Sequence, residues 1–166
     1  PSTGLPTKTE QSDLLQAMYG RNGESPAVVM AASLPGNCFH YAYEAVKIAV
    51  EHMTPVILLT DGYIGNSSQP WLIPEMNSLD SIIINHNVSA ENSWSPYRRD
   101  PESLVRPWEV PGTPGYEHRI GGLEKDPNTG MISYDPQNHE NMTHLPDSKI
   151  KKIANSIPDL QVEGEQ

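Results

Sequence analysis

The hydrophobic pattern is clearest between Ala27 and Gly62. Two short apolar runs, Ala27 to Ser33 and Val56 to Asp61, lack the polar alternation of a half-exposed strand. This pattern predicts strands that are covered on both faces in a parallel sheet. The residues between the two runs predict a helix, so the whole stretch is expected to form a right-handed β-α-β unit.

The expected crossover helix carries apolar residues at steps of three and four, which places them in one stripe along a helical face. The stripe consists of Cys38, Ala42, Ala45, Val46, Ala49, Val50 and Met53. Thr54-Pro55 should end the helix, because proline disfavours the helical region for the residue before it.

A second helix is predicted before this unit, from Glu10 to Tyr19. Thr7 as N-cap and Glu10 three residues later have the spacing of a capping box. Apolar residues of this helix are expected to face a core, and Gly20 is expected to end it in a left-handed conformation. The residues expected to face the core are Leu14, Leu15, Met18 and Tyr19.

After Gly62 the hydrophobic periodicity weakens. Gly62 to Trp71 reads as a polar loop, Ser81 to His86 as a short strand and Trp94 to Pro114 as irregular chain or linker. Eleven of the 16 prolines lie in this later part of the chain. The apolar core is therefore expected to come mainly from the first 62 residues.

The last third of the chain predicts a hairpin and a helix. Asp126 to Gly130 is a turn sequence between Tyr116 to Glu124 and Gly130 to Tyr134, which suggests a small hairpin. Gln137 to Ser156 has helical content, but Pro146 should break or kink that helix. The piece after Pro146 then has one apolar face, made of Ile150, Ile153, Ala154 and Ile157.

These elements predict an α/β fold: a partial doubly wound parallel sheet with a β-α-β core, then a long irregular, proline-rich segment with a small hairpin and a C-terminal helix. We expect residues 1–75 to be the second half of an α/β domain and residues 76–166 to be an extended connector. Two parallel strands need neighbours, and the chain opens at Pro1 without an initiator methionine. We therefore expect a fragment of a larger protein.

Composition narrows the possible partners and the cellular compartment. Hydrophobic residues make up 36% of the chain and the formal net charge is -10. Binding to nucleic acid is not expected, because phosphate neutralisation needs clustered lysine and arginine. The single cysteine, Cys38, excludes an internal disulfide and fits a reducing, cytoplasmic compartment. No run approaches the length of a membrane span, so no membrane association is expected.

The loop from Ser2 to Thr7 is the strongest candidate for a binding site. A glycine-containing loop that leads into a helix offers free N–H groups and the positive end of the helix dipole to a phosphate or carboxylate. The alternative is an ordinary capped surface helix.

Asp61 is the second candidate, because it follows a parallel strand at the sheet edge where open α/β folds bind ligands. Its alternative role is a turn formed with Gly62. Cys38 lies on the apolar stripe and is expected to be packed rather than reactive.

No two of the later histidines have a spacing typical of metal ligands, such as i, i+4 on a helix. Isolated surface histidines are therefore favoured over a metal site. The residues that folding could gather are His118, His139, His144, Glu117 and Glu140. The three tryptophans lie among prolines and are expected to anchor extended chain on a neighbouring surface.

Three stretches, which together cover most of the chain, resemble a known family. The runs concerned are PSTGLPTKTEQSDLLQAMYGRNGESP, CFHYAYEAVKIAVEHMTPVILLTDGYIGNSSQPW and PGTPGYEHRIGGLEKDPNTGMISYDPQNHENM. They are similar to the α subunit of 2-oxoacid:ferredoxin oxidoreductases, especially of the 2-oxoglutarate type. Pro146 departs from the family, in which a basic, helix-compatible residue is expected, and this puts the continuity of the last helix in question.

The resemblance implies thiamine diphosphate-dependent oxidative decarboxylation of a 2-oxoacid to an acyl-CoA, with electrons passed through iron–sulfur clusters to ferredoxin. The α subunit supplies the pyrimidine-side domain, whereas the β subunit mainly holds the diphosphate and Mg²⁺, and the clusters lie on other subunits. The expected partners are thus the β subunit, a second α copy, the 2-oxoacid, coenzyme A and ferredoxin. No cofactor is expected to bind tightly to this fragment alone.

The resemblance also implies that the activating glutamate and an arginine lie upstream of Pro1, so no catalytic or metal-ligating residue is assigned to this chain. The Ser2 to Thr7 loop is expected at the rim of the active site, with Thr3, Gly4 and Thr7 bordering the substrate pocket. Two alternatives stay open. One is a non-catalytic α/β module that wraps a partner subunit, and the other is a complete small domain that binds a phosphate ligand through its first loop.

Overall fold

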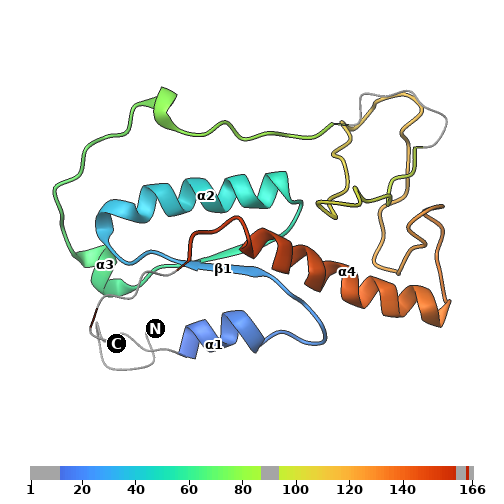
Figure 1. The fold of residues 1–166 in the computed structure, drawn as a ribbon, viewed down its shortest axis with the longest axis horizontal. Helices are drawn as coiled ribbons and strands as arrows, with labels where there is room; N and C mark the ends of the chain where they lie inside the picture. The colour runs from blue at the N-terminus through green and yellow to red at the C-terminus, as the bar shows by residue number, and fades with distance from the viewer. Residues whose placement is uncertain (1–11, 87–93, 160–163, 165–166) are drawn as a thin grey trace.

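The structure is a computed structural model that describes residues 12–86, 94–159 and 164. Its two strands pair in parallel, and its helices surround them (Figure 1). In chain order the elements are α1 (Ser12–Tyr19), β1 (Val28–Ala31), η1 (Pro35–Asn37), α2 (Cys38–Glu51), β2 (Val56–Leu59), α3 (Gly62–Asn66), η2 (Met76–Ser78) and α4 (Pro136–Ala154).

The predicted β-α-β unit is confirmed. β1 and β2 are parallel neighbours with Val28 opposite Val56 and Ala31 opposite Leu59, and α2 forms the crossover between them. Full cover on both faces is not found, because Val28 is the only buried residue in the two strands and all of β2 is half-buried. The described helices cover only part of this narrow sheet.

The contact face of α2 differs from the predicted stripe. Ile48, which lies outside the stripe, is the buried residue of α2, whereas Val46 within the stripe is 52% exposed. Helical spacing allows either face, and packing against the sheet and α4 selects the one with Ile48. The predicted end of the helix is confirmed: α2 stops at Glu51, and Met53 follows with a left-handed φ of 45°.

The core joins residues from both halves of the chain. Val28 of β1, Ile48 of α2 and Ile153 of α4 form the buried cluster, and Ile153 is only 1% exposed. Met30, Val56 and Ile150 pack around it. Most residues of this cluster lie within the first 62 residues, as predicted, but α4 contributes its most buried side chain.

α4 runs without interruption from Pro136 to Ala154 and includes Pro146. Of the predicted break or kink, the break is therefore wrong. The helix is held at both ends. Asp135 caps its start by accepting the Gln137 N–H at 3.2 Å, and its last turns carry Ile150 and Ile153 into the core. These contacts compensate for the loss of one helix hydrogen bond, because proline has no backbone N–H to donate.

α1 ends at Tyr19 as predicted, but its apolar face does not contact a core. Leu14, Leu15, Met18 and Tyr19 are all exposed, from 37% for Leu14 to 72% for Tyr19. The left-handed glycine after the helix is Gly23, with φ 69°, rather than Gly20. The Thr7–Glu10 capping box lies outside the described residues.

The segment between β2 and α4 is mostly irregular, as predicted for Trp94 to Pro114. The predicted strand from Ser81 to His86 is not formed; only His86 makes an isolated bridge, to Trp108. The predicted hairpin is present as a turn closed by an antiparallel bridge between Lys125 and Ile132. The expected polar loop after Gly62 instead begins with α3.

The extended chain after β2 is attached to the outer side of α2. The hydroxyl of Tyr43 donates to the carbonyl of Asp80 at 2.5 Å, and Lys47 pairs with the Asp80 carboxylate at 2.9 Å. Further along, the Trp108 indole donates to the carbonyl of Val50 at 2.7 Å. Polar contacts thus order a segment that has little regular structure.

Among the described residues, no helix combines the length and apolar character that crossing a membrane requires.

Candidate functional site

The carboxyl ends of β1 and β2 form the edge at which the sequence places Asp61. β1 is extended past its last paired residue by a hydrogen bond from the Ala32 N–H to the Leu59 carbonyl at 3.3 Å. Beyond this point each strand leads into a helix N-terminus, through η1 into α2 and through Asp61 into α3. Figure 1 shows both strand-to-helix connections at this end of the strands.

Asp61 caps α3. Its Oδ1 accepts the N–H of Ile64 at 2.8 Å and its own carbonyl accepts the N–H of Gly65 at 3.0 Å. A carboxylate at an N-cap satisfies one of the free N–H groups of the first turn. The observed contacts therefore give Asp61 a structural role, which corresponds to the turn-forming alternative.

The loop from β1 to α2 is fixed by amide side chains. Asn37 accepts the N–H of Leu34 at 3.1 Å and donates to the hydroxyl of Ser33 at 3.3 Å. The Gly36 N–H donates to the Gln69 side chain at 3.1 Å, and a Cβ on Gly36 would lie only 3.1 Å from the same oxygen. Gln69 therefore ties the chain beyond α3 back to this loop.

An aromatic pair lies beside this loop. Phe39 in the first turn of α2 and Trp71 have ring centroids 5.6 Å apart, and Phe39 also meets the His40 ring edge-on at 5.6 Å. Both Phe39 and Trp71 keep substantial exposed area. Trp71 thus anchors the extended chain to α2, as expected for the tryptophans.

The other predicted residues cannot be placed. Ser2, Thr3, Gly4 and Thr7 lie outside the described residues, so Asp61 is the only predicted site residue with a described environment. Sequence reasoning missed Gln69 and Asn37, because an amide in a polar loop carries no signal of a long-range partner. Gly36 between a proline and an asparagine was the one available sign of a tight turn.

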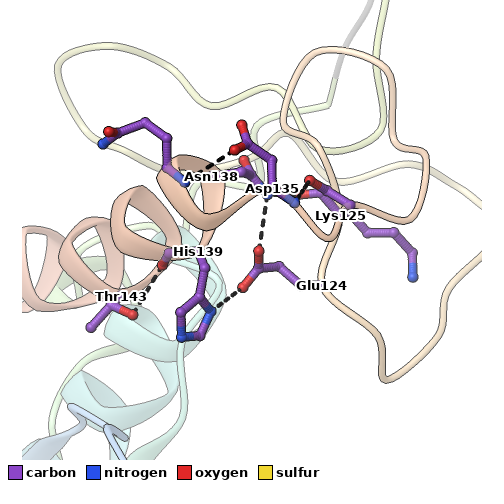
Figure 2. A network of polar contacts seen from close by, with 8 residues as sticks. Glu124, Lys125, Asp135, Asn138, His139 and Thr143 are labelled. Carbon is purple, nitrogen blue, oxygen red and sulfur yellow. Dashed lines mark hydrogen bonds and ion pairs between the residues drawn. The ribbon is translucent and has the colours of Figure 1, made fainter.

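Figure 2 shows a separate polar network, in which the hairpin is joined to the first turns of α4. The two oxygens of Glu124 hold the Asn138 amide at 3.1 Å and the His139 ring at 2.7 Å. Asn138 is buried and also donates to the Lys125 carbonyl at 3.1 Å. The Glu124 hydrogen bond raises the pKa of His139 above its ordinary value.

The histidines do not gather into a metal site in the part of the chain that is described. There, no group of three or more His, Cys, Asp or Glu side chains is placed to hold a metal ion. His139 pairs with Glu124, His118 contacts the Tyr116 carbonyl at 2.8 Å, and His144 lies 4.0 Å from Glu140. Cys38 is half-buried with its Sγ 3.6 Å from the Leu34 carbonyl.

Comparison with known proteins gives consistent matches. Residues 1–134 match the family described as pyruvate flavodoxin/ferredoxin oxidoreductase, thiamine diphosphate-binding. The chain is 56% identical over 164 residues to the 2-oxoglutarate oxidoreductase subunit KorA of Mycobacterium tuberculosis, covering 98% of this chain and 24% of that protein. It is 34% identical to the α subunit of 2-oxoacid:ferredoxin oxidoreductase 2 of Aeropyrum pernix, covering 96% of this chain and 24% of that subunit.

A solved structure has the same fold. The 2-oxoglutarate:ferredoxin oxidoreductase of Magnetococcus marinus, solved with 2-oxoglutarate, coenzyme A and succinyl-CoA bound, matches with a TM-score of 0.84 at 32% identity. The match covers all of this chain and 28% of that one. The chain thus spans about a quarter of the length of these relatives.

Proposed function

The chain belongs to the family of the thiamine diphosphate-binding domain of pyruvate flavodoxin/ferredoxin oxidoreductases, and on that premise we propose that it is part of the α subunit of a 2-oxoglutarate:ferredoxin oxidoreductase. The observation that carries the proposal is the 56% identity to the M. tuberculosis subunit over nearly the whole chain. 2-Oxoglutarate is favoured over pyruvate, because that relative and the matched solved enzyme are both named for it.

The proposed reaction is oxidative decarboxylation of the 2-oxoacid, with formation of its acyl-CoA and transfer of two electrons to ferredoxin. Bound thiamine diphosphate would supply the carbanion chemistry, and the protein would supply orientation and electrostatics. Among the described residues, no group of three or more His, Cys, Asp or Glu side chains is placed to hold a metal ion. We assign Mg²⁺ and the diphosphate mainly to the β subunit and the iron–sulfur clusters to other subunits.

The described residues would shape the edge of the pyrimidine-side domain. Gln69 and Asn37 fix the loop after β1, and Asp61 fixes the start of α3. Within the proposal, residues 1–75 are the second half of that domain and residues 76–166 are the connector. The protein would be cytoplasmic, would assemble with a β subunit and a second α copy, and would be inactive as this segment alone.

The test is the activity of the assembled enzyme. We expect the full-length polypeptide, coexpressed with its partner subunit, to reduce ferredoxin when both 2-oxoglutarate and coenzyme A are present. Leaving out coenzyme A or replacing 2-oxoglutarate by pyruvate should lower the rate at least tenfold. Equal or faster reduction with pyruvate would contradict the assignment of 2-oxoglutarate, and no reduction with any 2-oxoacid would contradict the enzyme as a whole.

The first loop provides a residue-level test. We propose that Thr3, Gly4 and Thr7, with Ser2, border the substrate pocket, because the loop precedes a helix and faces a substrate carboxylate in this reading. Thr3→Val and Thr7→Val in the complete complex should each lower kcat/KM for 2-oxoglutarate at least tenfold. Thr113→Val, in the connector, is the matched control. Unchanged kcat/KM in both loop variants would exclude a role in the pocket.

A second candidate is a non-catalytic module that binds a partner subunit. It is favoured by one observation: Leu72 and Ile73 in the chain after α3, and Met76 at the start of η2, have 78% or more of their surface exposed. The activity assay separates the two readings, because the module would copurify with its partner but show no substrate-dependent reduction.

A further inference from the structure

Three cationic side chains meet at the C-terminal end of α2, the end opposite to η1 and the candidate edge (Figure 1). Lys149 of α4 donates to the carbonyls of His52 and Met53 at 3.1 and 3.0 Å. Arg106 places Nη2 3.3 Å from the Met53 sulfur. Arg99 donates to the carbonyl of Leu104 at 3.2 Å, and it lies close enough to Arg106 and Lys149 for their charges to interact.

The three groups are withdrawn from water. Lys149 is only 8% exposed, and Arg99 and Arg106 are half-buried. The Nε of Arg99 is enclosed without a hydrogen-bond partner among the described residues. Burial first, and then the charges of Arg99 and Arg106, lower the pKa of Lys149 to about 8. Burial and then Arg106 lower the pKa of Arg99. The cluster is therefore self-repelling.

The nearby carboxylates of the described residues are engaged elsewhere. Asp100 accepts the N–H groups of Glu102 and Ser103 at 3.1 and 2.6 Å, and the cation that lowers its pKa, after these bonds, is Lys152. On α2, the Glu51 carboxylate accepts the N–H of Ile83 at 2.9 Å. The fourth titratable group, His52, has its pKa lowered by burial foremost; the Glu51 carboxylate acts in the opposite direction, and Lys149 adds to the lowering.

A shortage of acid does not explain this arrangement, because the chain has 21 acidic residues against 11 lysines and arginines. Buried charges in proteins are normally paired, since an uncompensated one costs several kcal/mol. Three cations gathered around one helix end, without a described acid acting on Lys149 or Arg99, thus call for a negative group from elsewhere.

We propose that Arg99, Arg106 and Lys149 form a binding site for an oxyanion. Guanidinium groups present planar, paired donors that match carboxylate and phosphate oxygens, and a lysine adds a point charge behind them. The Arg106 guanidinium is already oriented, because it lies 5.0 Å from the centre of the Tyr97 ring and donates to the Pro96 carbonyl at 3.3 Å. The oxyanion is either a free ion or ligand group, or a carboxylate of polypeptide outside the described residues.

The first measurement uses thermal unfolding of the full-length protein in its complex, with chloride replaced by inorganic phosphate at constant ionic strength. If the site takes a free oxyanion, Tm rises by several degrees and the effect saturates at millimolar phosphate. Arg99→Met should abolish this rise. Lys151→Met, which removes an exposed lysine from the same helix, should keep it.

The second measurement compares Arg99→Glu with Arg99→Met and identifies a protein carboxylate as the source. If a carboxylate already fills the site, the new glutamate is repelled, so Arg99→Glu has a Tm several degrees below that of Arg99→Met. If no anion is bound, the glutamate relieves the repulsion between Lys149 and Arg106, and Arg99→Glu is the more stable variant. That last order, together with no phosphate effect on the unmodified protein, would overturn the proposal. The same pair of changes at Arg106 replaces them if the Arg99 variants do not fold.

Discussion

At the scale of single residues, Asp61 shows that a residue placed where open α/β folds bind ligands can also fix the backbone. It follows a parallel strand at the carboxyl edge of the sheet, yet its carboxylate is bound to the N–H of Ile64. A turn formed with Gly62 was one of the two roles that the sequence suggested, but the cap of α3 was not predicted, because a five-residue helix has no hydrophobic periodicity to reveal it.

The N-cap contact of Asp61 allows a prediction about the free energy of unfolding. Asp61→Ala should lower the free energy of unfolding by about 1 kcal/mol, the typical cost of losing an N-cap side chain. Asp61→Asn keeps an acceptor oxygen and should lose less than half of that amount. Urea denaturation of the three proteins measures the difference. Equal losses for the alanine and asparagine variants would show that the charge, rather than the hydrogen bond, matters.

The ion pair of His139 with Glu124 makes a pH prediction. Because Glu124 raises the folded-state pKa of His139, this contact contributes fully below the unfolded pKa and is lost as the pH rises through the folded one. Amide exchange of residues 124–139, corrected for intrinsic rates, should therefore show less protection at about pH 8 than at about pH 6. His139→Gln should remove this dependence, whereas His144→Gln, a change to another exposed histidine of α4, should not. A pH dependence that persists in His139→Gln would assign it to another group.

At the scale of elements, α4 shows tertiary contacts overriding a local signal. Its sequence contains a proline that disfavours an unbroken helix, but each half of the helix is held by residues far away in the chain. Asn138 is bound by Glu124 near one end, and Lys149 is bound by the C-terminal carbonyls of α2 near the other.

The unfavourable proline can be tested by removing it. Pro146→Ala restores an N–H donor in the middle of α4 and should raise the free energy of unfolding by about 1 to 3 kcal/mol. A matched control is Ser148→Ala, which changes helix propensity alone and should have an effect of about 0.5 kcal/mol or less. Differential scanning calorimetry provides the measurement. A lower Tm for Pro146→Ala would mean that the proline sets a bend on which the packing of α4 depends.

The elements also mark how far hydrophobic patterning can predict this fold. The β-α-β unit followed from its apolar runs, because parallel pairing and the crossover leave a strong local pattern. The exposure of the apolar face of α1 could not be predicted from this patterning. An amphipathic sequence predicts that a helix will bury one face, but it does not indicate whether the same chain or another one covers that face.

At the scale of the whole molecule, the small core predicts a strong dependence on one side chain. Ile153 is 1% exposed and packs with Val28 and Ile48. Ile153→Ala should lower the free energy of unfolding by about 2 to 5 kcal/mol. Ile157→Ala, at a residue that is 44% exposed, should cost less than about 1 kcal/mol. Urea unfolding compares the two, and similar losses would show that α4 does not close the core.

The closure of the core by α4 was the main global feature that the sequence did not reveal. Ile150 and Ile153 were recognised as one apolar face, but their partner was not, since a helical stripe looks the same whichever surface it covers. The candidate loop at the start of the chain was recognisable as a motif. The cation cluster of Arg99, Arg106 and Lys149 was not, because its members become neighbours only after folding.

The position of α4 in the chain also sets the order in which the fold can be completed. The contact between Lys149 and His52 closes a loop of 97 residues, and closing long loops costs entropy before any packing is gained. During synthesis the strand pair and α2 therefore emerge long before the helix that buries Val28 and Ile48. Until then these side chains lack their cover from α4, and we expect the newly made polypeptide to be most prone to aggregation at this stage.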